Sequence, residues 1–212
     1  MISLRKRRAR LISEASRLGE LFNHYGRPTN SEGIIWSTGL LNHLWQAWCC
    51  FWRYYWLAYI QGGRDAGGSI IRGAYPGTSE AEAIYQMLVL AGKRRAGSYG
   101  AISSSHQEAT WGDIQRIQDI ANGLLSAYPS LSYVLSAASL HGQNIAHLQI
   151  IRNSQIHPSR SAQANTLMLA PHYLVRSSRF TPGELIYSQE IRSGRVAISY
   201  WIESIIAFAM MI

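Results

Sequence analysis

Apolar positions recur at three- and four-residue spacing along most of the chain, which is the pattern of helices that bury one face. Residues about 3–24 show it first, with basic residues between the apolar ones: Leu4, Leu11, Ile12, Ala15, Leu18, Leu21 and Phe22. Residues 25–30 contain Gly26 and Pro28 and break the pattern. The chain is therefore predicted to begin with a basic helix in residues 1–30, either an extension or the first helix of the following domain.

Residues about 34–60 are predicted to form a central buried helix, because they are apolar nearly all round and too long for a strand. Nine aromatic residues fall in this segment: Trp36, Trp45, Trp48, Phe51, Trp52, Tyr54, Tyr55, Trp56 and Tyr59. Its polar exceptions are Asn42, His43, Gln46 and Arg53. An unpaired buried Arg53 is costly, so it either pairs with a carboxylate or faces a site.

Capping residues mark three later helix starts. Ser79 with Glu82 opens a helix to about residue 91, and Thr110 with Asp113 opens one to about residue 128. Thr181, followed by a proline and Glu184, opens a helix that ends at residue 194. Residues 61–77 and 92–109 are rich in glycine or polar residues and are predicted to be loops.

A long apolar stripe runs from Leu131 to Ile156, with a pause expected at residues 141–144, where Asn144 offers a cap. Further apolar helices are expected at about 159–176, disturbed by Pro171, and at 196–212. No segment has the alternation of a strand. The fold class is therefore an all-α bundle of seven or eight helices, with one domain over residues 31–212.

Composition adds constraints on compartment and association. Only 15% of the 212 residues are charged, and such a chain is expected to bury apolar surface in a partner or a second copy of itself. The only cysteines, Cys49 and Cys50, are adjacent and suit a reducing compartment. Without a signal-peptide pattern or an apolar run of membrane-spanning length, the expectation is a cytoplasmic protein with no membrane association, metal or cofactor.

The net charge of +8 comes almost entirely from arginine, with 18 Arg against two Lys. Arginine favours the recognition of phosphate or carboxylate groups. Candidate RNA-binding residues are Arg5, Arg7 and Arg8 in the basic first helix and Arg94 and Arg95 in a loop. A solvated helix face explains the first group equally well.

The most specific chemistry lies in residues 148–158, where an aliphatic run leads to Arg152 and Asn153, then to His157 and Pro158. Arginine can hold a phosphate in bidentate fashion, and histidine can move a proton near neutral pH. An arginine followed by a histidine after four to six other residues occurs by chance, as Arg17 and His24 illustrate. The asparagine directly after Arg152 makes the full pattern a roughly one-in-fifty accident.

This Arg-Asn-x(3)-His pattern, with its aliphatic approach and its following proline, resembles the signature of the HEPN superfamily. The resemblance implies an all-α metal-independent endoribonuclease, acting as a toxin or anti-phage effector, with a possible antitoxin or partner protein. It implies that Arg152 binds the scissile phosphate, that His157 transfers a proton, and that Asn153 orients the pair. It also implies a homodimer with a composite active site, in which two Arg–His pairs face one phosphate.

Two other interpretations of the chain stay open. A non-catalytic HEPN-like module would bind RNA, a nucleotide or a partner protein, and a helical assembly subunit would use its aromatic helix and apolar tail as interfaces. Arg152 and His157 would then be an internally paired arginine and a histidine at a helix end. Asn42, Arg53 and His147 are possible cleft residues, since the first two are polar in an apolar helix and His147 lies just before Arg152.

Overall fold

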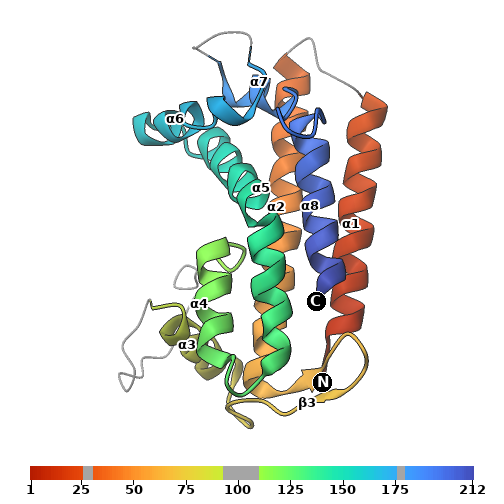
Figure 1. The fold of residues 1–212 in the computed structure, drawn as a ribbon, viewed down its shortest axis with the longest axis vertical. Coiled ribbons are helices and arrows are strands. Elements are labelled where there is room, and N and C mark those ends of the chain that lie inside the picture. Colours follow the sequence, from red (N-terminus) through yellow and green to blue (C-terminus); the bar gives the residue numbers. More distant parts are fainter. Residues whose placement is uncertain (26–30, 93–109, 176–179) are drawn as a thin grey trace. The chain divides into compact units, whose positions relative to one another are not determined.

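The computed structural model describes residues 1–25, 31–92, 110–175 and 180–212, and these are mostly helical (Figure 1). Helix accounts for 71% of the structure. Eight α-helices fall within the described residues, and their bounds are α1 Leu4–Tyr25, α2 Ser31–Gln61, α3 Glu80–Leu90, α4 Ile114–Leu124, α5 Ser132–Ile156, α6 Arg160–Leu167, α7 Pro182–Ile186 and α8 Ala197–Met211. Two short 3-10 helices, η2 and η3, cover Pro129–Leu131 and Ala170–His172. The predicted helical class and helix number are confirmed.

The contacts divide the chain into two compact units. The first unit comprises Met1–Ile12, Trp48–Leu140 and Phe208–Ile212, and the second comprises Ser13–Ala47 and His141–Ala207. Helices α1, α2, α5 and α8 each contribute residues to both units. The prediction of one domain over residues 31–212 stays a prediction.

The first unit is built around aromatic side chains of α2. Trp48, Trp52 and Trp56 recur every fourth residue, so they lie on one helix face, and each is fully buried. The Trp48 and Trp52 rings meet edge to face at 5.4 Å, and Phe208 of α8 packs on both. Aromatic pairs at such distances contribute about 0.5–1.5 kcal/mol beyond the area that they bury.

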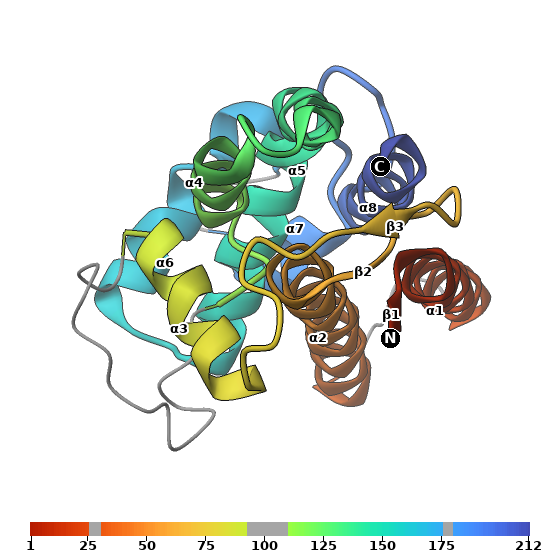
Figure 2. The same cartoon turned by 90° about the horizontal axis from the view of Figure 1, so that it is seen from below.

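A small sheet in the first unit corrects the prediction that the chain has no strand. Strands β1 (Ile2–Ser3), β2 (Gly63–Arg64) and β3 (Ile70–Ile71) lie in the order β1-β2-β3 (Figure 2). β1 pairs with β2 in parallel, and β2 pairs with β3 in antiparallel fashion. Two residues per strand are too few for any alternation of apolar and polar side chains, which is why the pattern predicted a loop for residues 61–77 and a helix from about residue 3.

Helix boundaries show where capping side chains act. The capping boxes at Ser79 and Thr181 are both present, as predicted. Asp113, and not Thr110, caps α4 by accepting the Arg116 N–H, and α4 ends at Leu124 instead of about residue 128. The predicted pause at residues 141–144 is wrong, because α5 continues through it and the Asn144 side chain donates to Ser204 Oγ at 3.0 Å.

Two predicted helices are shorter than expected. The helix predicted for 159–176 ends at Leu167, and Pro171 lies in η3. The helix predicted to run from Thr181 to Gly194 ends at Ile186. Gly194 instead closes a turn in which its N–H donates to the Glu190 carbonyl, with a positive φ of 67° that favours glycine. The last predicted helix is confirmed as α8.

Candidate functional site

Arg152 lies on α5 in the second unit, beside a fully buried apolar stripe. Ile145, Leu148 and Ile151 have no exposed surface and hold this part of α5 in the core. Arg152 follows Ile151 directly and is half-buried. The packed stripe therefore fixes the backbone that carries the guanidinium, while the guanidinium itself keeps access to solvent.

Two asparagine side chains hold the guanidinium of Arg152. Nε and Nη2 both donate to Oδ1 of Asn42, at 3.0 and 2.9 Å. Nη1 donates to Oδ1 of Asn153 at 3.1 Å. Asn42 lies on α2, between buried Leu41 and Leu44, so both asparagines belong to helices. The arginine is fixed from two sides.

These partners leave the charge of Arg152 uncompensated. Both acceptors are neutral amide oxygens, and among the described residues no carboxylate forms an ion pair with Arg152. A guanidinium has five N–H groups, and three of them make these bonds, so two remain. The result is a fixed positive charge with donors to spare, which suits binding of a phosphate oxygen.

His157 lies one residue beyond the end of α5 and is exposed. Its backbone N–H donates to the Asn153 carbonyl at 2.8 Å, so the last helical hydrogen bond ends on it. Within the described part of the chain, no hydrogen bond joins the imidazole to Arg152. Five helical residues correspond to a rotation of about 500°, so the two side chains leave an ideal helix about 140° apart. A single chain thus fixes Arg152 and exposes His157, and no hydrogen bond between their side chains is found in the described part of the chain.

A hydroxyl pair that the sequence did not indicate fixes α6 on the end of α5. Thr166 Oγ1 donates to Ser154 Oγ at 2.9 Å, and both residues are buried. Ser154 Oγ in turn donates to the carbonyls of Ile150 and Ile151. Ser159 caps α6. His157 therefore lies in a short connection between α5 and α6 that is held at both ends. No local sequence pattern predicts the hydrogen bond between Ser154 and Thr166, because the two residues belong to different helices.

His147 occupies a buried network instead of an open cleft. Its Nδ1 lies 2.8 Å from the Tyr173 hydroxyl, which accepts the Trp201 Nε1–H at 2.9 Å. An indole N–H can only donate, so the Tyr173 O–H is left to donate to Nδ1 of a neutral His147. Burial, and secondly the nearby His172, lower the pKa of His147 to about 4. His147 therefore holds the core together as a neutral imidazole.

Arg53 is paired within the first unit. Its Nη2 contacts the Glu80 carboxylate of α3 at 2.7 Å, which matches the expected pairing with a carboxylate. The Glu80 side chain is 60% exposed, so this ion pair contributes no more than about 1 kcal/mol. Of the three possible cleft residues, only Asn42 contacts Arg152.

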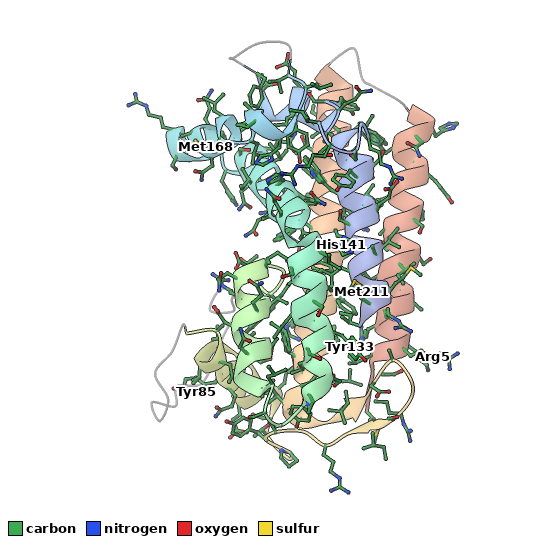
Figure 3. The ribbon with its side chains drawn as sticks, viewed as in Figure 1. Arg5, Tyr85, Tyr133, His141, Met168 and Met211 are labelled. Atoms are coloured by element: carbon green, nitrogen blue, oxygen red, sulfur yellow. The ribbon has the colours of Figure 1, made fainter. Side chains whose placement is uncertain are left out.

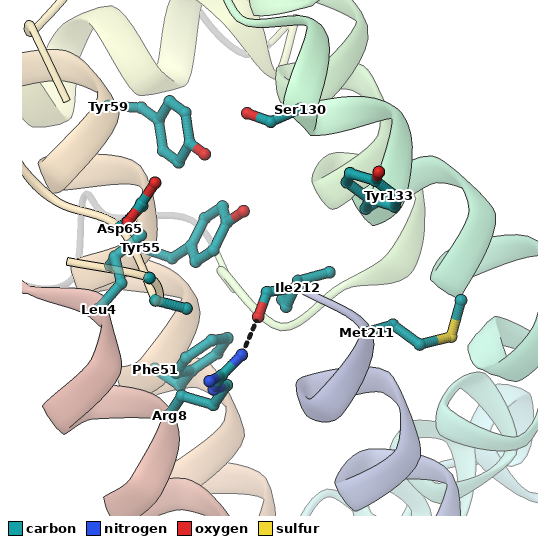
Figure 4. Close-up of a pocket in the computed structure, with 12 residues that line it drawn as sticks. Leu4, Arg8, Phe51, Tyr55, Tyr59, Asp65, Ser130, Tyr133, Met211 and Ile212 are labelled. Atoms are coloured by element: carbon teal, nitrogen blue, oxygen red, sulfur yellow. Dashed lines mark hydrogen bonds between the residues drawn. The ribbon is translucent and has the colours of Figure 1, made fainter. Parts of the chain in front are cut away.

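The basic residues of α1 have different environments. Arg8 Nη1 donates to the main-chain oxygen of Ile212 at 2.7 Å, beside a pocket of about 130 Å³ lined by Phe51, Tyr55 and Tyr59 (Figure 4). The Arg7 guanidinium lies 3.6 Å from the centre of the Tyr54 ring, while Arg5 is exposed (Figure 3). Arg94 and Arg95 lie outside the described residues.

Within residues 1–25, 31–92, 110–175 and 180–212, no group of three His, Cys, Asp or Glu residues has the geometry to hold a metal ion. No helix in these ranges is long and apolar enough to cross a membrane. Cys49 and Cys50 are not joined in a disulfide.

Comparison with known proteins returns no match to any family model, any curated protein or any solved structure.

Proposed function

We propose that this chain is a metal-independent endoribonuclease in which Arg152 binds the scissile phosphate and His157 transfers a proton. The motif from Arg152 to Pro158 supports this proposal through its resemblance to the HEPN signature. That resemblance extends the proposal to a toxin or anti-phage effector, restrained by an antitoxin or another partner protein.

One observation supports the proposal most strongly: Arg152 is held by Asn42 and Asn153, two neutral amides. A purely structural arginine would be expected to pair with a carboxylate, which would cancel its charge. Here the guanidinium is oriented and keeps its full charge. An oriented cation can stabilise the negative charge that develops on a phosphate in the transition state.

The proposed reaction needs no metal. The RNA 2′-oxygen attacks the adjacent phosphorus as its proton is removed, and the bond from phosphorus to the 5′-oxygen breaks as that oxygen gains a proton. The products are a 2′,3′-cyclic phosphate and a 5′-hydroxyl. Histidine suits either proton transfer near neutral pH, whereas one imidazole cannot serve both transfers in one step.

A homodimer with a composite active site would supply the second histidine. The exposure of His157 agrees with this arrangement. Apolar side chains at the end of α5 and at the end of α6 are also exposed: Ile156 by 37%, Leu167 by 40% and Met168 by 75%. Figure 3 labels Met168. Exposed apolar groups of this kind favour association.

The test is cleavage of a labelled RNA by the full chain in EDTA, with analysis of the product ends. Arg152→Ala and His157→Ala should each lower the cleavage rate at least about 100-fold, as expected when a catalytic group is lost. Arg192→Ala, which removes an exposed arginine of the second unit, is the matched control. In a composite site, the rate per chain should also rise with protein concentration. Equal cleavage by all three variants, with their folds intact, would exclude the proposal.

A second candidate is a non-catalytic phosphate-binding module. The hydrogen bonds that orient Arg152 come from Asn42 and Asn153 and not from His157, and they favour this candidate because an oriented arginine can bind a phosphate without a histidine. This candidate predicts that RNA binds and is not cut, and that Arg152→Ala weakens binding while His157→Ala does not.

A further inference from the structure

A basic hollow of about 580 Å³ lies at the start of α1 in the first unit. Its charged lining comes from Lys6, Arg7 and Arg10, and Ser3 and Gln61 complete its polar surface. The pairing of Ile2 and Ser3 with β2 fixes the residues that lead into α1 (Figure 2). The hollow is therefore bordered by regular secondary structure on both sides, by the start of α1 and by the end of α2.

The three cations share one side of α1 and remain uncompensated. Lys6 and Arg10 are four residues apart, so they stand about 6 Å apart along the same helix face. Arg7 is held against the Tyr54 ring. In the described part of the chain, none of these three residues forms an ion pair with a carboxylate. Like charges gathered without counter-charges favour an anionic ligand.

The other two basic residues of this helix do not line the hollow. Arg8 is bonded to the Ile212 main-chain oxygen, on the wall of a different pocket (Figure 4). The Arg5 side chain extends into solvent (Figure 3). Of the basic residues between Arg5 and Arg10 in α1, Lys6, Arg7 and Arg10 are the ones that line this hollow.

A second hollow of about 540 Å³ adjoins the first, since both are lined by Met1, Gln61 and Gly62. The second hollow is mostly apolar: Ile70, Ile71 and Pro76 contribute to its wall. Arg72 is the one charged residue among the described residues that line it. The Gln61 amide, at the boundary, is fixed because it donates to the Thr78 carbonyl at 2.9 Å. A cationic compartment thus lies next to an apolar one.

We propose that these two hollows form one binding site for a single-stranded nucleic acid. Successive phosphates lie against Lys6, Arg7 and Arg10, and a base or sugar lies against Ile70 and Pro76. Proteins that bind single strands combine a positively charged groove with apolar or aromatic contacts to the bases. The proposal rests on the proposed function only in naming RNA as the natural strand.

The test is fluorescence anisotropy of the full chain in EDTA with a labelled single-stranded DNA of twenty nucleotides, which lacks the 2′-hydroxyl needed for cleavage. Lys6→Gln and Arg10→Gln should each weaken binding about three- to tenfold and reduce the salt slope by about 0.7. Arg5→Gln removes the same charge from the same helix and should leave both quantities nearly unchanged.

Ile70→Ser tests the apolar compartment separately. The Ile70 side chain is 66% exposed, so its loss should leave the fold intact, which thermal unfolding checks. Binding should weaken severalfold with the salt slope unchanged, because no phosphate contact is lost.

Equal weakening by Arg5→Gln and Arg10→Gln would overturn the proposal, since binding would then depend on diffuse charge. Equal affinity for a duplex of the same length would also overturn it. If Lys6 and Arg10 control DNA binding but no RNA is cut, the binding site stands and the ribonuclease proposal fails. If RNA is cut through Arg152 while the Lys6 and Arg10 variants bind and cut normally, the reverse holds.

Discussion

At the scale of single residues, α5 carries one arginine without a carboxylate partner among the described residues, Arg152, and one buried histidine that stays neutral, His147. Arg152 is held by neutral amides and keeps its positive charge beside solvent. His147, one turn and a half earlier on α5, is hydrogen-bonded to Tyr173, and burial and secondly His172 lower its pKa so that it stays neutral. Both side chains make specific hydrogen bonds. Arg152 is accessible to solvent and can bind a ligand, whereas His147 is buried and stabilises the core.

Asn42→Asp tests whether RNA cleavage requires that Arg152 has no carboxylate partner. The substitution keeps the shape of the side chain and places a carboxylate where Oδ1 now accepts from Nε and Nη2. The resulting ion pair should preserve or slightly raise the free energy of unfolding, while it neutralises the guanidinium. RNA cleavage should fall at least about tenfold. Unchanged cleavage with a stable fold would mean that Arg152 has only a structural role.

The buried His147 predicts a loss of stability in mild acid. Its pKa is about 4 in the folded protein, against an ordinary value of 6.5, because burial and secondly His172 oppose its charge. Its stabilising contribution is complete above pH 6.5 and is lost as pH falls toward 4, since the unfolded chain takes up the proton first. This one group should lower the free energy of unfolding by about 2 kcal/mol between pH 7 and pH 5.

Urea unfolding at several pH values measures this effect. His147→Gln, whose amide oxygen can accept from Tyr173, should remove most of the loss between pH 7 and pH 5. His157→Gln changes an exposed imidazole at the end of the same helix and should keep the pH dependence of the unchanged protein. If both variants behave alike, His147 is not the group responsible.

At the scale of elements, helix identity followed from periodicity and helix ends from side-chain chemistry. The capping boxes at Ser79 and Thr181 were predictable because serine or threonine followed by glutamate three residues later acts locally. Asn144 looked like a cap in sequence, yet its partner is Ser204, sixty residues away. Local motifs were therefore predictable, whereas residues that bond to distant elements were not.

A glycine before α4 shows how closely that element meets α2. A Cβ added at Gly112 would lie 2.5 Å from Cδ1 of Trp48 and 2.9 Å from Sγ of Cys49. The Gly112 carbonyl also accepts the Trp48 Nε1–H at 2.9 Å. Gly112→Ala should therefore lower the free energy of unfolding by about 1–3 kcal/mol, as chemical denaturation would measure.

Gly39→Ala is the matched control for this prediction. Gly39 lies inside α2, is exposed, and has no atom within 4 Å of an added Cβ. Because alanine favours the helix by up to about 1 kcal/mol over glycine, the free energy of unfolding should rise. A loss of stability of the same size in both variants would contradict the close packing at Gly112.

At the scale of the whole molecule, the helical class was predictable and the grouping of residues was not. The spacing of apolar residues was sufficient to predict a helical fold, because the buried face of each helix can be recognised from its own sequence. The pairing of Ile2 with Gly63, and of Arg152 with Asn42, joins positions far apart along the chain. The candidate site was therefore predicted as a motif at Arg152, Asn153 and His157, while the role of Asn42 followed only from the structure.

The composition of the first unit constrains how the chain matures during synthesis. Residues 1–12 and 48–140 are synthesised before Phe208, which packs on Trp48 and Trp52. Before Phe208 is present, the Trp48 and Trp52 rings lack one of the side chains that cover them. Exposed apolar surface in a partly folded chain promotes aggregation. The nascent protein is thus expected to depend on chaperones until Phe208 has been synthesised, and neither unit corresponds to a contiguous fragment that could be expressed alone.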